Sequence, residues 1–519
     1  MQHLADCIRT LPSQSRETLL LERGFAAAKS RDAAGRPYPS VRIVLARRLS
    51  VAGHGLVAPR RKSPEGNLTM PSTEKLDTHH KALTLNLDAS AFGSFAEIGA
   101  GQEVARWFLV VGGASGTVAK TISAYDKEVS DDLYGSGSRY VSRQRLEAML
   151  DHEWSQLLTQ LSKTRGPQTR FFSFVDTVSA RNFAGTNEPH GWMGLRFQLQ
   201  PGGPPNDVLL HINLLDPSNL LQQEAIGILG VNLIYAAFHE LQTKESFLEG
   251  LAQDVVKERI EIDYVDFRGP AFESWDRRTL LAHLVYAGLA EAVFFPSKGP
   301  SVPPTETLYK KAIVLAPGTF SHVDAAHAQI HARLLASAIQ ELRKEQGETE
   351  ATPAGFFCLT ADSLTPNEPA PEVPDLLHRI DALLVGGGDV LLFRQRELYH
   401  MTALVNRYTK APLRFAAGLS LIIRGFDEIY GNLEGSRLEA LGRLFAQNVC
   451  IYAYPMTASD LQEWLKSAAA TGWEWSETNG WVSASQLRHA PPLGHLFAYL
   501  LASNFIVPMQ VPAALRADA

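Results

Sequence analysis

The chain has 519 residues, of which 45% are hydrophobic and 20% charged, so it can bury a large core and form two or three domains. Its formal net charge of −6 gives no broad electrostatic reason to expect nucleic acid or an anionic membrane as the main partner. Cys7, Cys358 and Cys450 form no CxxC pair, which argues against a disulfide framework or structural zinc and favours a cytoplasmic location.

The N-terminal segment differs in composition from the rest. Residues 1–69 contain ten arginines and two lysines against five acidic residues. The segment lacks sustained amphipathic periodicity and an apolar core, so a targeting peptide is disfavoured. We predict that residues 1–77 are a disordered extension, or that the start codon was assigned too early and Met70 is the first residue. The longest apolar stretch, at 226–238, is too short to span a bilayer, and no transmembrane helix is predicted.

Apolar residues alternate with polar ones in three segments of the next part of the chain, which predicts half-buried strands there. The alternating residues are Leu83, Leu85 and Leu87; Leu195, Phe197 and Leu199; and Ile260, Ile262 and Tyr264. Dense apolar stretches at 219–240 and 276–295 predict helices that pack on a sheet. We therefore expect an α+β domain over 78–297, with a largely antiparallel sheet. The Pro/Gly/Ser-rich segment 296–305 reads as a linker.

Beyond the linker, short apolar strands alternate with helical segments. The strands are "AIVLA", "GFFCL", "DVLLF" and "VCIYAY", and the helices cover 324–345, 396–408, 436–447 and 459–469. This alternation is typical of an α/β domain with a parallel sheet, predicted here over 305–510. The proline-rich stretch 360–375 is expected to be an excursion from it. Ligands of such sheets bind at the loops that follow the strands.

The first of these loops is "PGTFSHVD". A strand that ends at Ala316, followed by Gly318 and a helix that begins near Ser321 or Asp324, would point backbone N–H groups at one spot, where anions bind. The alternative is a simple turn in which Gly318 adopts a tight dihedral angle. The sequence pattern alone does not decide between an anion site and a simple turn.

Two motifs carry a resemblance to a known family. "GTFSHVDAAH", at 318–327, resembles the signature that opens nucleotidylyltransferases of the nicotinate or nicotinamide mononucleotide adenylyltransferase type. "VSASQLR", at 482–488, resembles the second motif of that superfamily, and "LGHLFAYLLASNFI" resembles its closing helix. About 165 residues separate the motifs, near the family's usual span, and the resemblance covers about 308–508. The pattern from 78 onward also resembles a family of uncharacterised bacterial proteins.

The resemblance implies a Rossmann-like domain that joins ATP to a mononucleotide and releases pyrophosphate, with Mg²⁺ accompanying ATP. The implied catalytic residues are His327 and Arg488. The implied nucleotide-binding residues are Gly318, Thr319, Phe320, His322, Ser483 and Ser485. No metal ligand from the protein is implied. The expected partners are ATP and a mononucleotide, without nucleic acid or membrane, and a homo-oligomer is possible.

The chain departs from the family pattern in three places. Asp324 stands where the family has its first signature histidine, Ala326 where it has a glycine, and His322 where it usually has a proline. A carboxylate beside a polyphosphate is repulsive. The alternatives are therefore a degenerate domain that binds a nucleotide or nothing, and a non-catalytic oligomeric scaffold or interaction protein. A third alternative, that the 78–297 domain is itself an enzyme, suggests no particular reaction.

Other patterns give weaker signals. "GGASGTVAKT" is similar to a P-loop, but Ala114 and Ala119 replace its glycines, so a flexible turn before a helix is expected. His327, His331 and Asp324 could share one helix face and hold a metal, although solvent-exposed histidines are commoner. Three further carboxylates, Asp176, Asp216 and Asp266, could converge on magnesium; equally, Asp216 caps the following helix and the others lie in turns. The glycines in "DALLVGGGDVLLF" predict a helix end.

Overall fold

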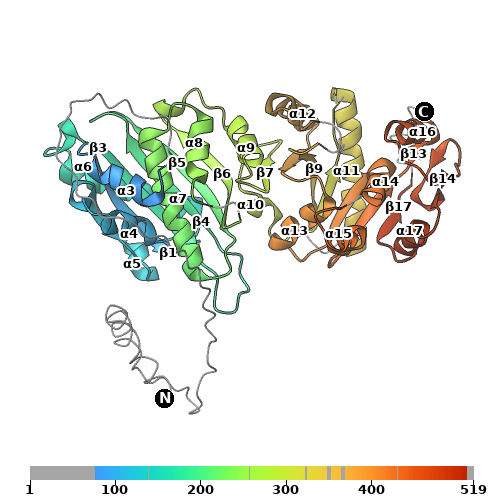
Figure 1. The fold of residues 1–519 in the computed structure, drawn as a ribbon, viewed down its shortest axis with the longest axis horizontal. Helices are drawn as coiled ribbons and strands as arrows, with labels where there is room; N and C mark the ends of the chain where they lie inside the picture. Colours follow the sequence, from blue (N-terminus) through green and yellow to red (C-terminus); the bar gives the residue numbers. More distant parts are fainter. Residues whose placement is uncertain are drawn as a thin grey trace, which may run out of the picture. The chain divides into compact units, whose positions relative to one another are not determined.

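The computed structural model describes residues 76–510, apart from 138, 256–257, 322–323, 348–351, 364–368 and 429. Its helices and strands are labelled from α3 and β1 onward (Figure 1). Residues 1–75, and so almost all of the predicted extension, lie outside the described residues. His322 and part of the proline-rich stretch 360–375 lie outside them as well.

The first half of the described chain is built on a six-stranded sheet of strand order β2-β1-β3-β4-β5-β6. β2, β1 and β3 run parallel, and β3 to β6 are antiparallel neighbours. The sheet is therefore mixed, and the expected antiparallel arrangement holds for its second part. The elements of this half are α3 (Thr78–Leu87), β1 (Ala91–Gly99), α4 (Glu103–Val110), β2 (Val118–Ile122), α5 (Lys127–Tyr134), α6 (Arg143–Leu161), β3 (Arg170–Ser179), β4 (His190–Gln198), β5 (Pro205–Leu214), α7 (Asn219–His239), α8 (Lys244–Ala252), β6 (Ile260–Arg268) and α9 (Arg277–Tyr286).

Helices cover both faces of this sheet. Phe172 and Phe174 of β3 face α7, where the Phe172 ring packs edge-on against Phe238 with centroids 5.9 Å apart. Gly194, the cross-strand partner of Val175, faces α6, and a Cβ there would stand 3.0 Å from the Leu150 side chain. β3 and β4 are therefore buried on both sides. The apolar alternation at 195–199 and 260–264 correctly predicted the strands β4 and β6, but the expectation that they are half-buried was wrong, because almost all of their residues are buried.

Two local predictions in this half are wrong. Residues 83–87 form part of helix α3, not a strand, because the buried residues Thr78, Ala82 and Leu85 follow helical spacing and Asp77 caps the helix by accepting from the His80 N–H. The P-loop-like segment follows helix α4 and leads into strand β2, the reverse of the expected order. Gly112 and Gly113, with φ of 88° and 76°, end the helix there.

The second half is built on a seven-stranded sheet of order β17-β12-β11-β8-β9-β10-β7, parallel except for β7. The predicted strands and helices are confirmed here, with small shifts of their ends. The elements are β7 (Ala292–Phe295), α10 (Pro304–Leu308), β8 (Ile313–Pro317), α11 (Ala325–Gln346), β9 (Ala354–Thr360), α12 (Val373–Val385), β10 (Asp389–Phe393), α13 (Leu398–Tyr408), β11 (Leu413–Gly418), α14 (Leu419–Asp427), α15 (Ser436–Leu444), β12 (Val449–Tyr454), β13 (Met456–Thr457), α16 (Ala458–Ser467), β14 (Trp473–Trp475), β15 (Trp481–Val482), β16 (Leu487–His489), α17 (Leu493–Ala502) and β17 (Ile506–Pro508).

Successive residues of the central strands enter different hydrophobic cores. Ile313 and Leu315 of β8 pack with α13, α14 and α15, whereas Val314 packs with α11 and α12. Both faces of the sheet are therefore covered, as the continuous apolar strands require. The chain builds outward from β8 through β9 to β10, returns to β11 beside β8, and continues outward through β12 to β17. This is the 3-2-1-4-5-6 order of a doubly wound fold, and its topological switch point lies between β8 and β11.

The segment before the linker belongs partly to the second sheet. The predicted helix at 276–295 ends at Tyr286, because Gly288 adopts a φ of 70°, and residues 292–295 form β7, which pairs with β10. The predicted ranges 78–297 and 305–510 remain a prediction. Among the described residues one helix, α7, is long and apolar enough to cross a membrane, but 72% of its most apolar window is buried in the protein.

Candidate functional site

A cavity of about 570 Å³ lies at the switch point of the seven-stranded sheet. Its walls are formed by the carboxyl ends of three neighbouring parallel strands and by the residues that follow them: 316–321 at the end of β8, 416–418 with Ser420 and Leu421 at the end of β11, and 454–455 at the end of β12. In an open α/β sheet, the carboxyl ends of the strands diverge at this point and leave a crevice for a ligand. The described residues that complete the lining are His327, His331, Leu334, Leu335, Phe357, Arg424 and Trp464.

The loop after β8 is held by main-chain contacts and by the Phe320 ring. The Gly318 N–H donates to the Cys358 carbonyl at 3.1 Å, and the Thr319 carbonyl accepts from the Arg379 guanidinium at 3.0 Å. The left-handed residue is Phe320, with a φ of 48°, rather than Gly318 as the simple-turn interpretation expected. A Cβ on Gly318 would stand 2.9 Å from the Phe320 ring, so close approach of this ring requires the glycine.

The start of α11 carries its own carboxylate. Asp324 Oδ1 accepts from the His327 N–H at 2.9 Å and contacts His327 Nδ1 at the same distance. Asp324 therefore caps the helix, a role that its position before an apolar helix could have revealed. His331 packs edge-on against Phe320 with ring centroids 5.1 Å apart, and burial, followed by the charge of His327, lowers the pKa of His331.

The wall that faces this loop is formed by residues that the sequence did not single out. Gly418 precedes α14 with a φ of −76° and no side-chain cap on the helix, and Ser420 lies in the first turn. Arg424 is half-buried, and its guanidinium lies 6.0 Å from the centre of the Trp464 ring of α16. The sequence signal for this wall was the glycine that ends the buried strand "LRFAAG". Only the strand order shows that this strand lies next to β8.

The sequence-predicted residues are thus only partly brought together. Gly318, Thr319, Phe320 and His327 line the cavity. Ser483, Ser485 and Arg488 are not among its lining residues. Ser483 caps a short 3-10 helix at 484–486 and contacts the Ser485 hydroxyl at 2.7 Å. Arg488 is exposed on β16 and donates to the carbonyls of Ser485 and Leu487, both at 2.7 Å.

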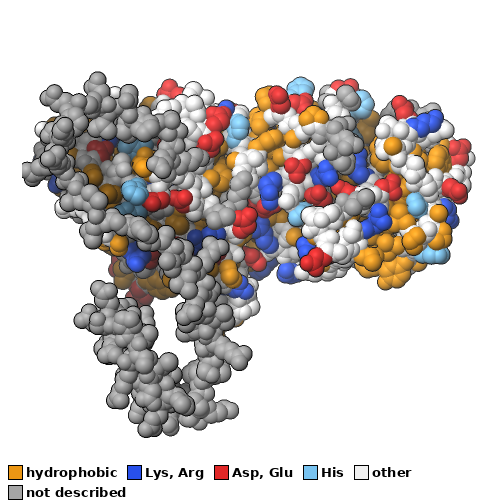
Figure 2. Space-filling view, in the orientation of Figure 1, with side chains coloured by type: hydrophobic (Ala, Val, Ile, Leu, Met, Phe, Trp, Pro, Cys, Tyr) orange, Lys and Arg blue, Asp and Glu red, His pale blue; other side chains and the backbone are white. Residues whose placement is uncertain are grey.

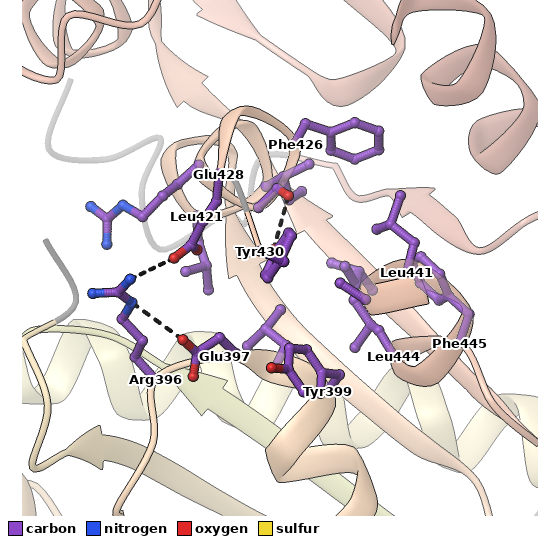
Figure 3. Close-up of a pocket in the computed structure, with 16 residues that line it drawn as sticks. Arg396, Glu397, Tyr399, Leu421, Phe426, Glu428, Tyr430, Leu441, Leu444 and Phe445 are labelled. Carbon is purple, nitrogen blue, oxygen red and sulfur yellow. Dashed lines mark hydrogen bonds and ion pairs between the residues drawn. The ribbon is translucent and has the colours of Figure 1, made fainter. Parts of the chain in front are cut away.

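A second, more apolar pocket lies on the other side of α14 (Figure 3). Its cavity volume is about 50 Å³, enough for a few water molecules but not for a nucleotide. Charged groups at its rim pair with one another, since Arg396 pairs with Glu428 at 2.5 Å and lies 3.7 Å from Glu397. We therefore place the candidate site in the larger cavity at the switch point.

The metal hypotheses find no geometric support among the described residues. There, the one group of His, Cys, Asp and Glu with suitable spacing is the exposed set Asp77, His79 and His80. Asp216 and Asp266 do not converge: Asp216 pairs with Arg259 at 2.8 Å, and Asp266 is buried among three arginines of its own. Ser218, not Asp216, caps α7.

Asp176 instead lies beside another buried carboxyl group, that of Glu97, its cross-strand partner on β1. The Glu97 carboxylate accepts from the backbone N–H groups of Gln102, Val104 and Ala105 at 2.9 to 3.1 Å, at the start of α4. Burial, and then the charge of Glu97, raises the pKa of Asp176 well above its usual range. One proton held by this pair removes the repulsion between the two groups.

A chain of hydrogen bonds crosses strands β4, β5 and β6. His190 Nδ1 lies 3.1 Å from His211 Nε2, and His211 Nδ1 lies 2.6 Å from Asp263 Oδ1. Burial, and then the neighbouring His211, lowers the pKa of His190 to about 4, partly offset by Asp263, while Arg139 lowers it further. His190 therefore stays neutral in the folded protein at physiological pH.

This depressed pKa predicts a loss of stability in acid. Between pH 6.5 and 4 the unfolded chain binds a proton at His190 that the folded chain does not, so stability falls as the pH falls through this window. The contribution is about 3 kcal/mol. We expect His190→Asn to reduce by about this amount the fall in unfolding free energy between pH 7 and 4, measured by urea titration. An equal fall in the parent protein and in His190→Asn would contradict the prediction.

No protein-family model matches the chain, and no curated protein matches it. Three solved structures do. A competence/damage-inducible protein from Agrobacterium tumefaciens is 18% identical, with 32% of this chain and 98% of that chain covered and a TM-score of 0.23. A competence or damage-inducible protein from Enterobacter asburiae is 12% identical, with 31% and 95% covered and a TM-score of 0.22. A competence-damaged protein superfamily member from Enterobacter cloacae is 13% identical, with 36% and 99% covered and a TM-score of 0.20. At such TM-scores the likeness carries no inference about function.

Proposed function

We propose that the C-terminal half binds a nucleotide in the cavity between β8 and β11. The observation that carries the proposal is the position of this cavity at the switch point of a 3-2-1-4-5-6 sheet, with residues 318–320 and His327 in its lining. One wall is apolar, formed by Phe320, Leu335 and Phe357, and suits a ring. The start of α14 and Arg424 lie on the other wall and suit a negative charge.

The reaction that fits the resemblance is adenylyl transfer from ATP to nicotinate or nicotinamide mononucleotide. A phosphate oxygen of the mononucleotide attacks the α-phosphorus of ATP, a new P–O bond forms, the bond to the bridging oxygen breaks, and pyrophosphate leaves. Catalysis of this step needs positioning and positive charge rather than a covalent intermediate. The resemblance assigns His327, which lies in the lining, a contact with the phosphates.

Magnesium would reach this site with the nucleotide. The described lining residues include no carboxylate, so these residues offer no carboxylate ligand for Mg²⁺. The phosphates of ATP would hold the ion, which would neutralise part of their charge.

Isothermal titration tests the binding claim on the full chain. We expect ATP with Mg²⁺ to give a saturable signal, and nicotinate mononucleotide to bind in its presence. Absence of heat with both ligands would rule out the proposed function. Release of pyrophosphate from the two ligands together then tests transfer separately from binding.

A non-catalytic role is the second candidate. Ser483, Ser485 and Arg488, which the family pattern assigns to pyrophosphate, are absent from the cavity lining, and Asp324 places a negative charge at the start of α11. Hydrophobic side chains also gather near α17 in Figure 2. Of this apolar helix only Phe497 and Leu500 are buried, and Tyr499 is 58% exposed, as expected for a surface that meets another protein. Light scattering separates the two roles: a strict monomer that releases pyrophosphate would exclude the scaffold.

A further inference from the structure

Arg424 is the one lysine or arginine among the described residues that line the cavity. It lies in the last turn of α14, on the wall opposite the residue 316–321 loop, and is half-buried. Its guanidinium lies over the face of Trp464, which contributes to its orientation. Leu421 and Arg424 also line the apolar pocket of Figure 3, so both residues border the two hollows.

The family pattern assigns the positive charge of the site to Arg488, but the arginine that lines the cavity is Arg424. Arg488 is exposed, and its Nη1 atom already donates to two backbone carbonyls of its own segment. Its strand, β16, pairs with β14 in a separate two-stranded sheet. Arg424 lines the cavity, whereas Arg488 does not.

The two helix starts at the cavity also differ in charge. The start of α11 carries the carboxylate of Asp324, which occupies the His327 N–H. The start of α14 carries Gly418 and Ser420 and has no side-chain cap. A phosphate is repelled at the first position and attracted at the second, on the same side of the cavity as Arg424.

We propose that Arg424 binds the phosphate group of the ligand, which lies against α14, while the ring of the ligand packs on the Phe320 side. The proposal rests on the proposed function and assigns its main charged contact. The ligand class is a nucleotide with at least one phosphate. A nucleoside without phosphate lacks the group that Arg424 recognises, because a guanidinium-to-phosphate contact is charge-assisted.

The experiment compares Arg424→Ala, Arg424→Lys and the matched Arg488→Ala by isothermal titration of the full chain with Mg²⁺-ATP and with adenosine. We expect Arg424→Ala to weaken ATP binding at least tenfold, with Arg424→Lys between it and the parent protein. Arg488→Ala should stay within twofold of the parent. Adenosine affinity should be unchanged in every variant, which shows that the variants are folded.

The outcomes separate this inference from the proposed function. If the parent protein binds neither ATP nor adenosine, the proposed function fails, and this inference with it. If the parent binds ATP and Arg424→Ala binds it equally well, the site assignment stands and the role of Arg424 is overturned. If Arg488→Ala alone lost ATP affinity, the phosphate contact would be assigned to the motif at 482–488 instead.

Discussion

Gly418→Trp should strongly weaken nucleotide binding while leaving the protein folded. Gly418 lines the cavity and has a φ of −76°, which any residue can adopt. A Cβ there would meet only the Ser420 hydroxyl oxygen, at 4.0 Å, so the backbone accepts a side chain. An indole at this position would occupy the space next to the start of α14. We expect the affinity for Mg²⁺-ATP to fall by roughly 100-fold, about 2.7 kcal/mol, in isothermal titration.

The matched control is Gly431→Trp in the same half of the chain. Gly431 is exposed and does not line the cavity, and a Cβ at this position would have nothing within 4 Å. This variant should bind ATP as the parent does, and both variants should melt within a few degrees of it. Equal ATP affinity for Gly418→Trp and the parent would move the binding site away from the β11 side of the cavity.

Local patterns predicted the second half of the fold well. The apolar strands "AIVLA" and "VCIYAY" are short, continuous and separated by helices, a pattern that is typical of a parallel sheet covered on both faces. In the first half, three leucines at 83–87 were misleading, because alternation over so few residues also fits a helix. Asp77, which caps α3, was the signal that favoured the helix.

Only one side of the candidate site could be predicted from the sequence. Gly318, Thr319 and His327 are neighbours in sequence and follow one strand, so a motif can identify them. Gly418 and Arg424 lie about 100 residues further along the chain, and they meet the Gly318 loop only because β11 returns to pair with β8. No local pattern encodes that pairing, since strand order is decided by long-range packing.

Asp266→Asn is expected to cause the largest loss of stability. Asp266 is fully buried on β6 and pairs with Arg143 of α6 at 2.6 Å, with Arg268 at 2.8 Å, and with Arg277 at the start of α9. Glu147 is the one other carboxylate that pairs with members of this described group, through Arg143 and Arg268. The asparagine keeps the shape but removes the charge, so three guanidinium groups would face a single carboxylate.

We expect Asp266→Asn to lower the free energy of unfolding by about 3 kcal/mol in urea titration, the lower end of the range for breaking a buried pair, because the carboxylate is buried but the three arginine side chains are 28 to 40% exposed and stay partly solvated. Asp151→Asn is the control: Asp151 also pairs with an arginine, Arg196, at 2.8 Å, but its side chain is 71% exposed and Arg196 keeps its second partner, Asp207. Exposed pairs contribute about 0 to 1 kcal/mol. Equal losses for the two variants would show that Asp266 does not hold α6 and α9 to the sheet.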